Sequence, residues 1–457
     1  MKIINPANQV VLEDVPEDNA AAIAAKVARA RAAQPAWAAT PLPERLATIA
    51  RFRDALVTHK DELALLLTRE MGKPLSQARN ELSAMPGRLD FFLRETTGVL
   101  ADETVFREGD AAAPKLEEIV AHEPLGVVAN VSAWNYPYFV GSNVFVPALL
   151  TGNSVVYKPS ELATLTGLRI VGLLHEAGVP ADAMIAVVGG GAAGAALVEA
   201  AVDGVFFTGS YATGKRIAQA LSGRMVKLQL ELGGKDPTYV CDDVDVKAAA
   251  EGLADGAMYN NGQSCCSVER IYVHQGVYAA FIDAFTKTVR GFVVGSPEDP
   301  ATYIGPLARR DQLAVLEAQV ADAVARGGRL LCGGRRLAGN VFEPTVIADA
   351  TNAMALMREE SFGPVIGIAP VADDDQAVRL MNDTDYGLTA GVYSPSQERA
   401  RAILRRVDAG SVYWNCCDRV SPRLPWTGRK HSGMGSTLST HGIRTFVQPK
   451  AWHLRRA

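Results

Sequence analysis

Two α/β domains in series, each built on a doubly wound sheet, are the architecture that this sequence predicts. At 457 residues the chain is too long for a single compact hydrophobic core. From residue 126 onward, short apolar β runs alternate with helix-like segments, a pattern typical of a parallel sheet covered on both faces. The alternation starts again after Gly233 and Gly234 and continues to about residue 415, which predicts the second domain.

The first hundred residues are predicted to be helical. An Ala-rich segment begins after Asp18, the run 44–58 is amphipathic, and residues 61–70 carry apolar side chains at helical spacing. A charged stretch from Glu103 to His122 follows, in which apolar and charged residues interleave. This interleaving predicts an exposed hairpin rather than a core element.

Short apolar runs predict the buried strands of the two sheets. The segment 126–157 has no charged side chain, but Asn130 and Pro137 within it would be costly in hydrocarbon. It is therefore interpreted as strand, turn, helix and strand, and not as a membrane span. The C-terminal segment, which includes Trp452 and Leu454, is predicted to form a helix and a strand. The predicted strands are residues 127–131, 154–157, 184–188, 204–207, 226–230, 238–241 and 270–274.

Composition and charge limit the classes of partner and compartment. The chain is 48% hydrophobic and 21% charged with a formal net charge of −4, which is ordinary for a soluble globular protein. Charges of both signs are interspersed, so neither a nucleic-acid partner nor a membrane is expected. The N-terminus lacks the pattern of a targeting peptide, which predicts a cytoplasmic protein. The six cysteines and seven histidines show no metal-site spacing, so reduced thiols and no metal are expected.

Three residues have side chains suited to covalent catalysis. Cys265 follows a Gly-containing turn and can be presented at a helix N-terminus, which would lower the pKa of its thiol; a buried structural cysteine is the alternative. Glu231 ends an apolar strand, where burial would raise its pKa as a general base requires; a solvated or paired carboxylate is the alternative. Asn135 lies in an apolar run and can donate to an oxyanion, or it can cap the following helix.

Small residues between strands and helices indicate a dinucleotide site. Gly209 and Ser210 separate an apolar strand from a helix, so that a backbone can approach pyrophosphate at the positive end of that helix. Lys158 and Glu161 end another strand, and a carboxylate there can hold ribose hydroxyls.

Two further stretches are candidates for cofactor binding. Gly189, Gly191 and Gly194 match the pattern GxGxxG in form, although the same run can also serve only to pack a helix closely on the sheet. Residues 359–364 form an acidic and aromatic turn in the second predicted domain.

Seven stretches together resemble the motifs of one enzyme family. They run from about residue 124 to about residue 435 and read WNYP, GNSVVYKPSE, FFTGSYATGK, LELGGK, NNGQSCC, EESFGPV and PWTGRKHSGMG. They occur in the order of the family motifs, and the helical first hundred residues fit the family as well. The chain thus resembles the NAD(P)-dependent aldehyde dehydrogenase superfamily. Each motif alone is weak, but their combination favours this family over the separate structural alternatives.

The resemblance implies a role for each candidate residue. Cys265 would be the nucleophile, aligned through its Gly-Gln-x-Cys context, in preference to the neighbouring Cys266. Asn135 would hold the oxyanion, and Glu231 would activate the water that hydrolyses the thioester to the carboxylic acid. Cofactor contacts would come from Trp134, Lys158, Glu161, Gly209, Ser210, Glu360 and Phe362. The substrate pocket would be lined by Tyr136, Tyr138, Phe139, Asn143, Ser264, Cys266, Val420 and Trp426.

Two doubly wound domains and a small β arm are the fold that the resemblance implies. A Rossmann-like NAD(P)-binding domain would comprise residues 1–102 and 124–232, and the catalytic domain would comprise residues 233–433. Residues 103–123 and 434–457 would form the oligomerisation arm and bridging segments. Family members pair through these segments, so a homodimer or a homotetramer is expected, with no choice between them.

Two positions near the base depart from the family pattern. Many members have a lysine at the position of Val144 and a glutamate at the position of Thr437, and these two side chains are thought to carry protons away from the base. The relay is therefore expected to be absent at both ends, which leaves Glu231 to exchange protons directly with water. The presence of this glutamate favours hydrolysis over transfer of the acyl group to coenzyme A.

The sequence favours NAD as the cofactor and leaves the aldehyde open. Glu161 should repel a 2′-phosphate and accept ribose hydroxyls, whereas Lys158 beside it would still permit NADP. The default substrate is a medium-sized aliphatic or aromatic aldehyde. A semialdehyde is the alternative if Arg419 or Arg423 meets its distal carboxylate, although exposed loop arginines more often meet only water. A non-catalytic relative of the same fold is the last alternative, and the presence of both nucleophile and base argues against it.

Overall fold

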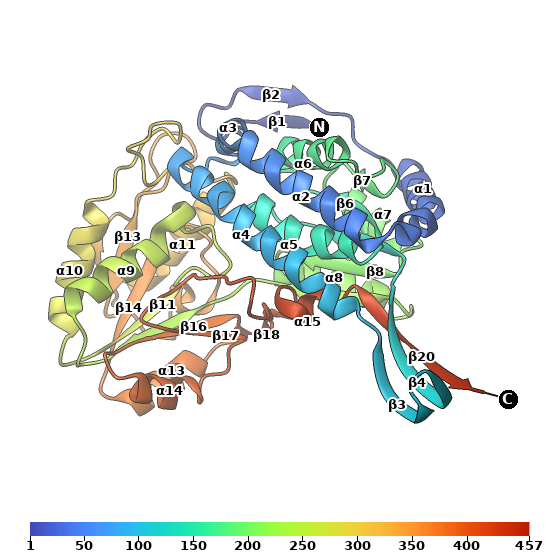
Figure 1. The fold of residues 1–457 in the computed structure, drawn as a ribbon. Helices are drawn as coiled ribbons and strands as arrows, with labels where there is room; N and C mark the ends of the chain where they lie inside the picture. The colour runs from blue at the N-terminus through green and yellow to red at the C-terminus, as the bar shows by residue number, and fades with distance from the viewer. Residues whose placement is uncertain (457) are drawn as a thin grey trace.

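Two large sheets and one small antiparallel sheet organise the molecule (Figure 1). The structure is a computed structural model that describes residues 1–456. The N-terminal helices lie over the first large sheet, the second large sheet forms the other lobe, and the small sheet projects from the body as an arm. The α/β architecture with a small β arm that the sequence predicts is therefore observed.

The first sheet has six strands, of which only one edge strand runs antiparallel to its neighbour. From edge to edge they are β19 (Gly433–Met434), β9 (Lys227–Glu231), β8 (Gly204–Thr208), β5 (Val127–Val131), β6 (Ser154–Lys158) and β7 (Met184–Ala186). The order of winding reverses at β5, because β6 and β8 pair with it on opposite sides. The carboxyl ends of β5 and β8 therefore form a topological switch point, where sheets of this kind bind ligands.

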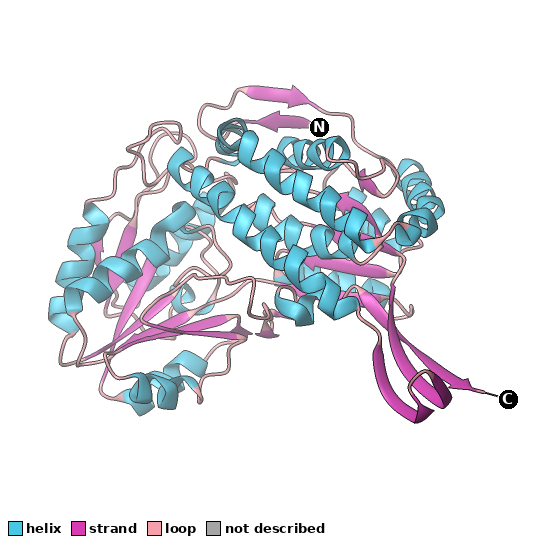
Figure 2. Ribbon diagram, in the orientation of Figure 1, coloured by secondary structure: helices cyan, strands magenta, loops and turns pink. Residues whose placement is uncertain are grey.

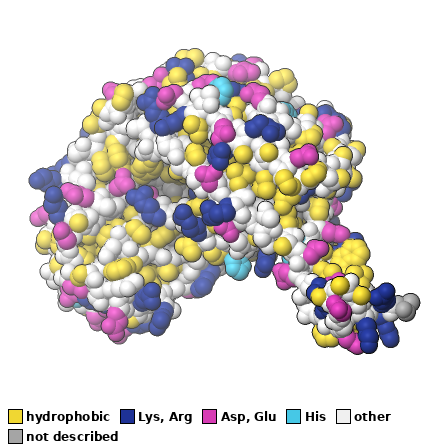
Figure 3. All heavy atoms as spheres, in the orientation of Figure 1, with side chains coloured by type: hydrophobic (Ala, Val, Ile, Leu, Met, Phe, Trp, Pro, Cys, Tyr) yellow, Lys and Arg dark blue, Asp and Glu magenta, His cyan; other side chains and the backbone are white. Residues whose placement is uncertain are grey.

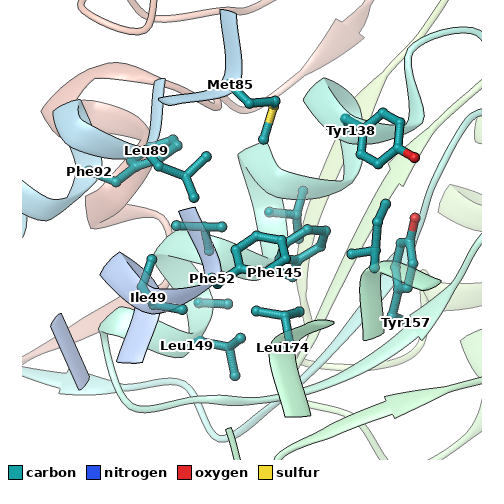
Figure 4. Packing of buried hydrophobic residues seen from close by; sticks show 14 of the residues in the cluster. Ile49, Phe52, Met85, Leu89, Phe92, Tyr138, Phe145, Leu149, Tyr157 and Leu174 are labelled. Carbon is teal, nitrogen blue, oxygen red and sulfur yellow. The ribbon is translucent and has the colours of Figure 1, made fainter. Parts of the chain in front are cut away.

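Helices cover both faces of this sheet. One face carries α2 (Leu42–Thr58), α3 (Lys60–Met71), α4 (Leu75–Leu100), α5 (Pro137–Leu150) and α6 (Thr164–Glu176), and the other carries α1 (Ala20–Ala39), α7 (Gly191–Glu199) and α8 (Tyr211–Leu221). Successive side chains of β5 alternate between them: Val128 packs on the first side and Val127 on the second. On the first side the Phe145 ring lies 6.1 Å from Phe52 and 5.6 Å from Tyr157, between ring centroids (Figure 4).

The second sheet has seven strands and the same layered construction. In order they are β12 (Arg329–Cys332), β13 (Thr345–Ala348), β14 (Val365–Val371), β11 (Arg270–His274), β10 (Pro237–Val240), β16 (Thr389–Tyr393) and β17 (Ser411–Trp414). Only β12 pairs antiparallel. One face carries α9 (Val246–Met258) and α10 (Tyr278–Arg290), and the other carries α11 (Gln312–Ala325), α12 (Ala355–Arg358), α13 (Asp374–Asn382) and α14 (Gln397–Leu404). The remaining short elements are η1 (Tyr259–Gly262), the paired strands β15 (Tyr386–Gly387) and β18 (Arg429–Lys430), and α15 (Ser439–Arg444).

The predicted exposed hairpin and terminal strand meet in the arm (Figure 2). It consists of β3 (Glu103–Asp110), β4 (Ala113–Pro124) and β20 (Val447–Arg455), with β4 in the centre. Every residue of β3 is exposed, and apolar side chains on the arm, such as Phe106 and Trp452, face solvent. On the face shown in Figure 3, charges of both signs are dispersed over the remainder of the surface.

The N-terminus differs from the prediction of an entirely helical first hundred residues. β1 (Lys2–Ile4) and β2 (Val11–Asp14) form an antiparallel hairpin ahead of α1. The strands are too short for their side-chain alternation to be read from the sequence. The uncharged segment 126–157 forms strand, turn, helix and strand as predicted. Within residues 1–456, no helix combines the length and apolar character needed to cross a membrane.

Candidate functional site

A cavity of about 780 Å³ opens at the carboxyl ends of β5 and β8 and extends to the start of α11 and the loop before β14. Cys265 and Asn135 line it, so the candidate nucleophile and the candidate oxyanion donor share one wall. All seven residues expected to contact the cofactor also line it: Trp134, Lys158, Glu161, Gly209, Ser210, Glu360 and Phe362. The structure thus brings together residues that the sequence separates by more than two hundred positions.

The loop that carries Cys265 is held in a fixed conformation. Asn261 adopts a left-handed backbone with φ of 60°, and its side-chain oxygen accepts a hydrogen bond from Gly305 N at 2.7 Å. Gly262 has φ of +70°, and a Cβ added there would lie 2.2 Å from Gly363 O. A residue larger than glycine therefore cannot occupy this position without displacing the turn of the second domain.

The two adjacent cysteines face different surroundings. Cys265 is partly exposed and lines the cavity, whereas Cys266 is only 6% exposed and belongs to the hydrophobic core. Ser264 Oγ lies 3.4 Å from Cys266 Sγ, which gives the second thiol a polar contact inside that core. This geometry agrees with the choice of Cys265 rather than Cys266 as the candidate nucleophile.

One expectation about Cys265 is wrong: no helix begins at this residue. After η1 the chain forms a turn and then enters β11, so this loop offers the sulfur no helix N-terminus. The pKa of the Cys265 thiol is raised, chiefly by its hydrogen bond with Cys266, then by burial and by the charges of Glu231 and Glu360. Because only the thiolate attacks, the Cys265 thiol needs a base that accepts its proton.

Asn135 does not cap the following helix. Its Nδ2 donates to Gln263 O at 3.2 Å, in the loop just before Cys265. The carboxylate of Glu81 takes the capping position instead, because its Oε1 accepts from Tyr138 N at 3.0 Å. One N–H of the Asn135 amide is therefore engaged with the nucleophile loop, and the second remains for a ligand.

Glu231 is the last residue of β9 and is buried, with 7% of its surface exposed. Burial raises the pKa of this carboxyl to about 7; hydrogen bonds from Thr437 and Gln229 and the charge of Arg88 act in the opposite direction. Gln229 Nε2 donates to Glu231 Oε1 at 2.8 Å. A carboxyl that titrates near neutral pH is suited to general-base work at that pH.

One of the two supposedly empty relay positions touches the base. The Thr437 hydroxyl donates a hydrogen bond to Glu231 Oε1. Antiparallel pairing of β19 with β9, together with a two-way backbone bridge between Trp426 and Thr437, places this hydroxyl over the carboxylate. Val144 is a buried apolar side chain in the core, as expected. A polar side chain is therefore missing at the position of Val144 but present at the position of Thr437.

The cofactor wall is formed by junctions between strands and helices. Ser210 is the N-cap of α8 and accepts from Thr213 N at 3.4 Å, directly after Gly209 and β8. Lys158 is 4% exposed, and its Nζ lies 3.8 Å from an oxygen of the exposed Glu161. Gly190, Gly191 and Gly194 of the glycine-rich stretch line the same cavity.

The loop between α12 and β14 contributes Glu360 and Phe362 to the opposite wall. The Trp134 and Phe362 rings meet edge to face with centroids 5.5 Å apart. Glu360 Oε1 accepts from Gly234 N at 3.1 Å, and burial raises the pKa of this glutamate to about 8. A Cβ on Gly233 would lie 2.4 Å from Glu360 Oε2, so the glycine lets the carboxylate approach the backbone.

None of the eight residues expected to line the substrate pocket lines the cavity described above. Tyr138 is 1% exposed, donates from its hydroxyl to Leu63 O at 3.1 Å, and packs in the core shown in Figure 4, so its placement in the pocket is wrong. Tyr136 stacks on Phe139, with ring centroids 6.0 Å apart. Ser264, Cys266, Asn143 and Trp426 are buried, and Val420 is partly buried.

Sequence reasoning missed three contributors to the site. Arg88 reaches from α4 to Asn143 Oδ1 at 2.7 Å, and Arg309 and Gln312 line the cofactor cavity near the start of α11. None lies in a motif or at a strand end, so no local pattern could have identified them. The two loop arginines proposed for a distal carboxylate, Arg419 and Arg423, are exposed.

Comparison with known proteins places the chain in one family. The model described as "Aldehyde dehydrogenase family" matches residues 1–452. A probable succinate-semialdehyde dehydrogenase [NADP(+)] of Sinorhizobium fredii is 35% identical over 98% of this chain and 91% of its own length. A betaine aldehyde dehydrogenase of Cereibacter sphaeroides is also 35% identical, over 98% of this chain and 92% of its own length.

Solved structures agree with this assignment. An NAD-dependent aldehyde dehydrogenase from Sinorhizobium meliloti superposes with a TM-score of 0.95 at 33% identity and covers 99% of this chain and 91% of its own. The expected fold class, enzyme class and nicotinamide cofactor class are thereby confirmed. Matched along nearly its whole length in sequence and in structure, this chain belongs to the aldehyde dehydrogenase family.

Proposed function

We propose that this chain oxidises an aldehyde to its carboxylic acid through a covalent intermediate on Cys265, with Asn135 and Glu231 as its partners. The observation that carries the proposal is the convergence of three segments at one cavity. Cys265 lines that cavity, Asn135 Nδ2 bonds to Gln263 O beside it, and Glu231 ends the strand just before Gly233 in the cavity wall. A Cβ on Gly234 would lie 2.9 Å from Cys265 O, so the segment that follows the base packs against the nucleophile.

The chemistry then follows from these side chains. The Cys265 sulfur, after loss of its proton to a base, adds to the aldehyde carbonyl, and the free N–H of Asn135 donates to the oxygen that becomes negative. NAD(P)⁺, when bound, would supply the hydride acceptor that oxidation of this adduct to a thioester requires. Glu231, ionised above about pH 7, removes a proton from water, whose oxygen attacks the thioester carbon. The carbon–sulfur bond breaks, the acid leaves, and the sulfur regains a proton.

The cavity suits a dinucleotide. Gly209 and the N-cap Ser210 stand at the switch point before α8, where a pyrophosphate meets backbone N–H groups at a positive helix end. On the opposite wall, Phe362 and the Glu360 carboxylate face the same space. Lys158, the last residue of β6, and Glu161, three residues later, would hold the ribose hydroxyls.

NAD is proposed as the preferred form of the cofactor. A 2′-phosphate would approach the exposed Glu161 carboxylate, and the repulsion would be only partly offset by Lys158, whose pKa is lowered by burial. Steady-state kinetics with each cofactor and one aldehyde measure this preference. A higher kcat/KM with NADP would contradict the assignment of Glu161.

A panel of aldehydes with and without a terminal carboxylate tests the function itself. Formation of NADH at 340 nm, together with identification of the acid product by mass spectrometry, should occur for at least one class. An absence of NADH with every aldehyde, in protein that still binds NAD, would refute the proposed reaction and revive a binding role. A semialdehyde is the second candidate class, and a buried arginine favours it below.

We further propose that the arm joins subunits and that the active form is a homodimer or a homotetramer in the cytoplasm. Within residues 1–456 the β3 and β20 edges of the arm have no further strand partner, and exposed edge strands pair readily with another copy. The division into residues 1–102 with 124–232, 233–433, and the segments 103–123 with 434–457 remains a proposal of the same kind. Light scattering of the purified protein gives the assembly size, and a monomer would exclude a joining role for the arm.

A further inference from the structure

The strongest unexplained feature is a buried guanidinium beside the proposed reaction centre. Arg88 projects from α4 and is 4% exposed. Its Nη1 donates to Asn143 Oδ1 at 2.7 Å, and its Cζ lies 4.4 Å from the centroid of the Phe139 ring. Its Nη2 contacts Val420 O at 3.5 Å, the limit of a hydrogen bond. Three of the residues expected to line the substrate pocket therefore surround this one side chain.

No acid in the described chain is paired with this charge. Between residues 1 and 456, no carboxylate oxygen lies within 4.0 Å of the guanidinium. Glu81 is already engaged, because one of its oxygens contacts Lys73 Nζ at 2.5 Å and the other accepts from Tyr138 N. Glu231, whose pKa is about 7, is half neutral near that pH and accepts from other donors. The Arg88 Nε atom is buried and has no acceptor at all.

Other buried arginines of this chain show what a purely structural role requires. Arg270 is fully buried, and all three of its nitrogens donate to backbone carbonyls at 2.8 to 3.1 Å. Arg45 is 7% exposed and likewise donates to several backbone carbonyls. Arg88 has one good acceptor and one marginal acceptor. A buried charge with an unsatisfied donor is costly to a fold unless a ligand completes it.

We propose that Arg88 is the specificity-determining residue of this enzyme and that it binds the carboxylate at the far end of a semialdehyde substrate. A carboxylate offers two acceptors in the plane that a guanidinium fork matches, and it would satisfy Nε and replace the marginal contact with Val420 O. The proposal rests on the proposed aldehyde oxidation and names its substrate class. It assigns to Arg88 the task that the sequence offered to the exposed Arg419 and Arg423.

The first test uses the unmodified full-length enzyme with matched substrates. Succinate semialdehyde is compared with its methyl ester and with butanal, and glyoxylate, malonate semialdehyde and glutarate semialdehyde then vary the distance from aldehyde to carboxylate. The expected result is a kcat/KM at least about 30-fold higher for the best semialdehyde than for its ester, the smallest usual effect of a desolvated charge pair. Equal kcat/KM for acid and ester would overturn the proposal while leaving aldehyde oxidation intact. No NADH from any aldehyde would instead refute the proposed function.

The second test removes the charge and keeps the volume. Arg88→Met should raise KM for the semialdehyde and lower its kcat/KM at least about 30-fold, with butanal changed less than about threefold. Arg88→Lys, which keeps the charge without the fork, should recover part of the loss. Arg94→Met removes an exposed arginine from the same helix and is the matched control, with no expected change in selectivity.

Inhibition by the product class separates recognition from a structural role. Succinate should compete with the aldehyde in the unmodified enzyme, whereas butyrate should compete far less, and the difference should vanish in Arg88→Met. If the variant lost activity equally with semialdehyde and butanal, Arg88 would act on Glu231 or on folding, and the proposal would be wrong. A loss of selectivity in Arg419→Met instead would move the carboxylate contact to the loop. If Arg88→Met did not fold, a comparison of succinate with butyrate as inhibitors of Arg88→Lys would still decide.

Discussion

The two sides of Cys265 differ in how well the sequence describes them. On the cofactor side, all seven predicted contacts line one cavity. On the substrate side, Tyr138 packs in the core, Tyr136 and Phe139 stack on each other, and Arg88 was not predicted at all. Site residues at junctions between strands and helices can be predicted from the local sequence pattern. Site residues on the packed faces of helices cannot.

The physical reason is that different structural elements position the residues on the cofactor side and on the substrate side. A parallel sheet fixes where its strands end, so Gly209 and Lys158 line the same cavity because β8 and β6 flank β5 in the sheet. The substrate side depends on packing between α4, α5 and a loop far along the chain. Arg88 lies 55 positions from Asn143 and 332 positions from Val420. No period or motif encodes such contacts.

The largest expected effect falls on the residue between the two sides. Cys265→Ala should lower kcat on the order of 10⁴-fold or more, because no other thiol lines the cavity. Binding of NAD, measured by calorimetry, should be unchanged. Cys266→Ala is the matched control and should retain most activity. Full activity in the Cys265 variant would remove the nucleophile assignment.

The next largest effect is expected at Glu231, where a variant distinguishes hydrolysis of the thioester from hydride transfer. Glu231→Gln should slow the release of acid about 10²- to 10⁴-fold, since a general base contributes that much. The first turnover should still occur, so rapid mixing should show a burst of one NADH per active subunit followed by a slow phase. Loss of the burst together with the steady rate would mean that Glu231 is needed before the thioester forms.

A smaller effect tests whether Thr437 takes part in controlling the base. Its hydroxyl lowers the pKa of Glu231, so Thr437→Val should raise that pKa from about 7. The base acts when ionised, so the hydrolysis rate rises with pH and its midpoint should move to higher pH in the variant. At neutral pH the rate should fall about threefold, because the loss of a hydrogen bond of about 1 kcal/mol lowers the ionised fraction of a group that titrates near pH 7 by about that factor, with no loss at high pH. An unmoved midpoint would show that the contact does not influence catalysis.

The smallest expected effect tests whether Tyr138 belongs to the hydrophobic core or to the substrate side. Tyr138→Phe removes the hydrogen bond to Leu63 O from the core and should lower the free energy of unfolding by about 1 kcal/mol. The value of kcat/KM should stay within about twofold, since this hydroxyl does not face the reacting groups. Denaturant titration measures the first quantity. A change in kcat/KM at unaltered stability would return Tyr138 to the substrate pocket.

Much of the fold could be predicted because the spacing of apolar residues along a segment indicates which face of a helix or strand is buried. The runs 127–131 and 270–274 are strands as predicted, and the interleaved stretch from Glu103 to His122 is the exposed hairpin. The β1–β2 hairpin was missed because its strands are too short to show a period. The absence of a helix after Cys265 was also missed, because a Gly-containing turn before a cysteine does not show whether a helix or a strand follows; here the chain continues into β11.

The pairing of β19 with β9 has a consequence for how the enzyme is made. The hydroxyl that contacts Glu231 belongs to a residue 206 positions later in the chain. During synthesis on the ribosome, β9 is an unpaired edge of its sheet until the segment that contains β19 and Thr437 has been made. Until then the Glu231 carboxylate lacks its hydrogen bond from Thr437. The reactive thiol is synthesised well before the base reaches its final environment. Maturation of hydrolytic activity is therefore coupled to completion of the chain, and protein truncated before Gly433 should lack this part of the site.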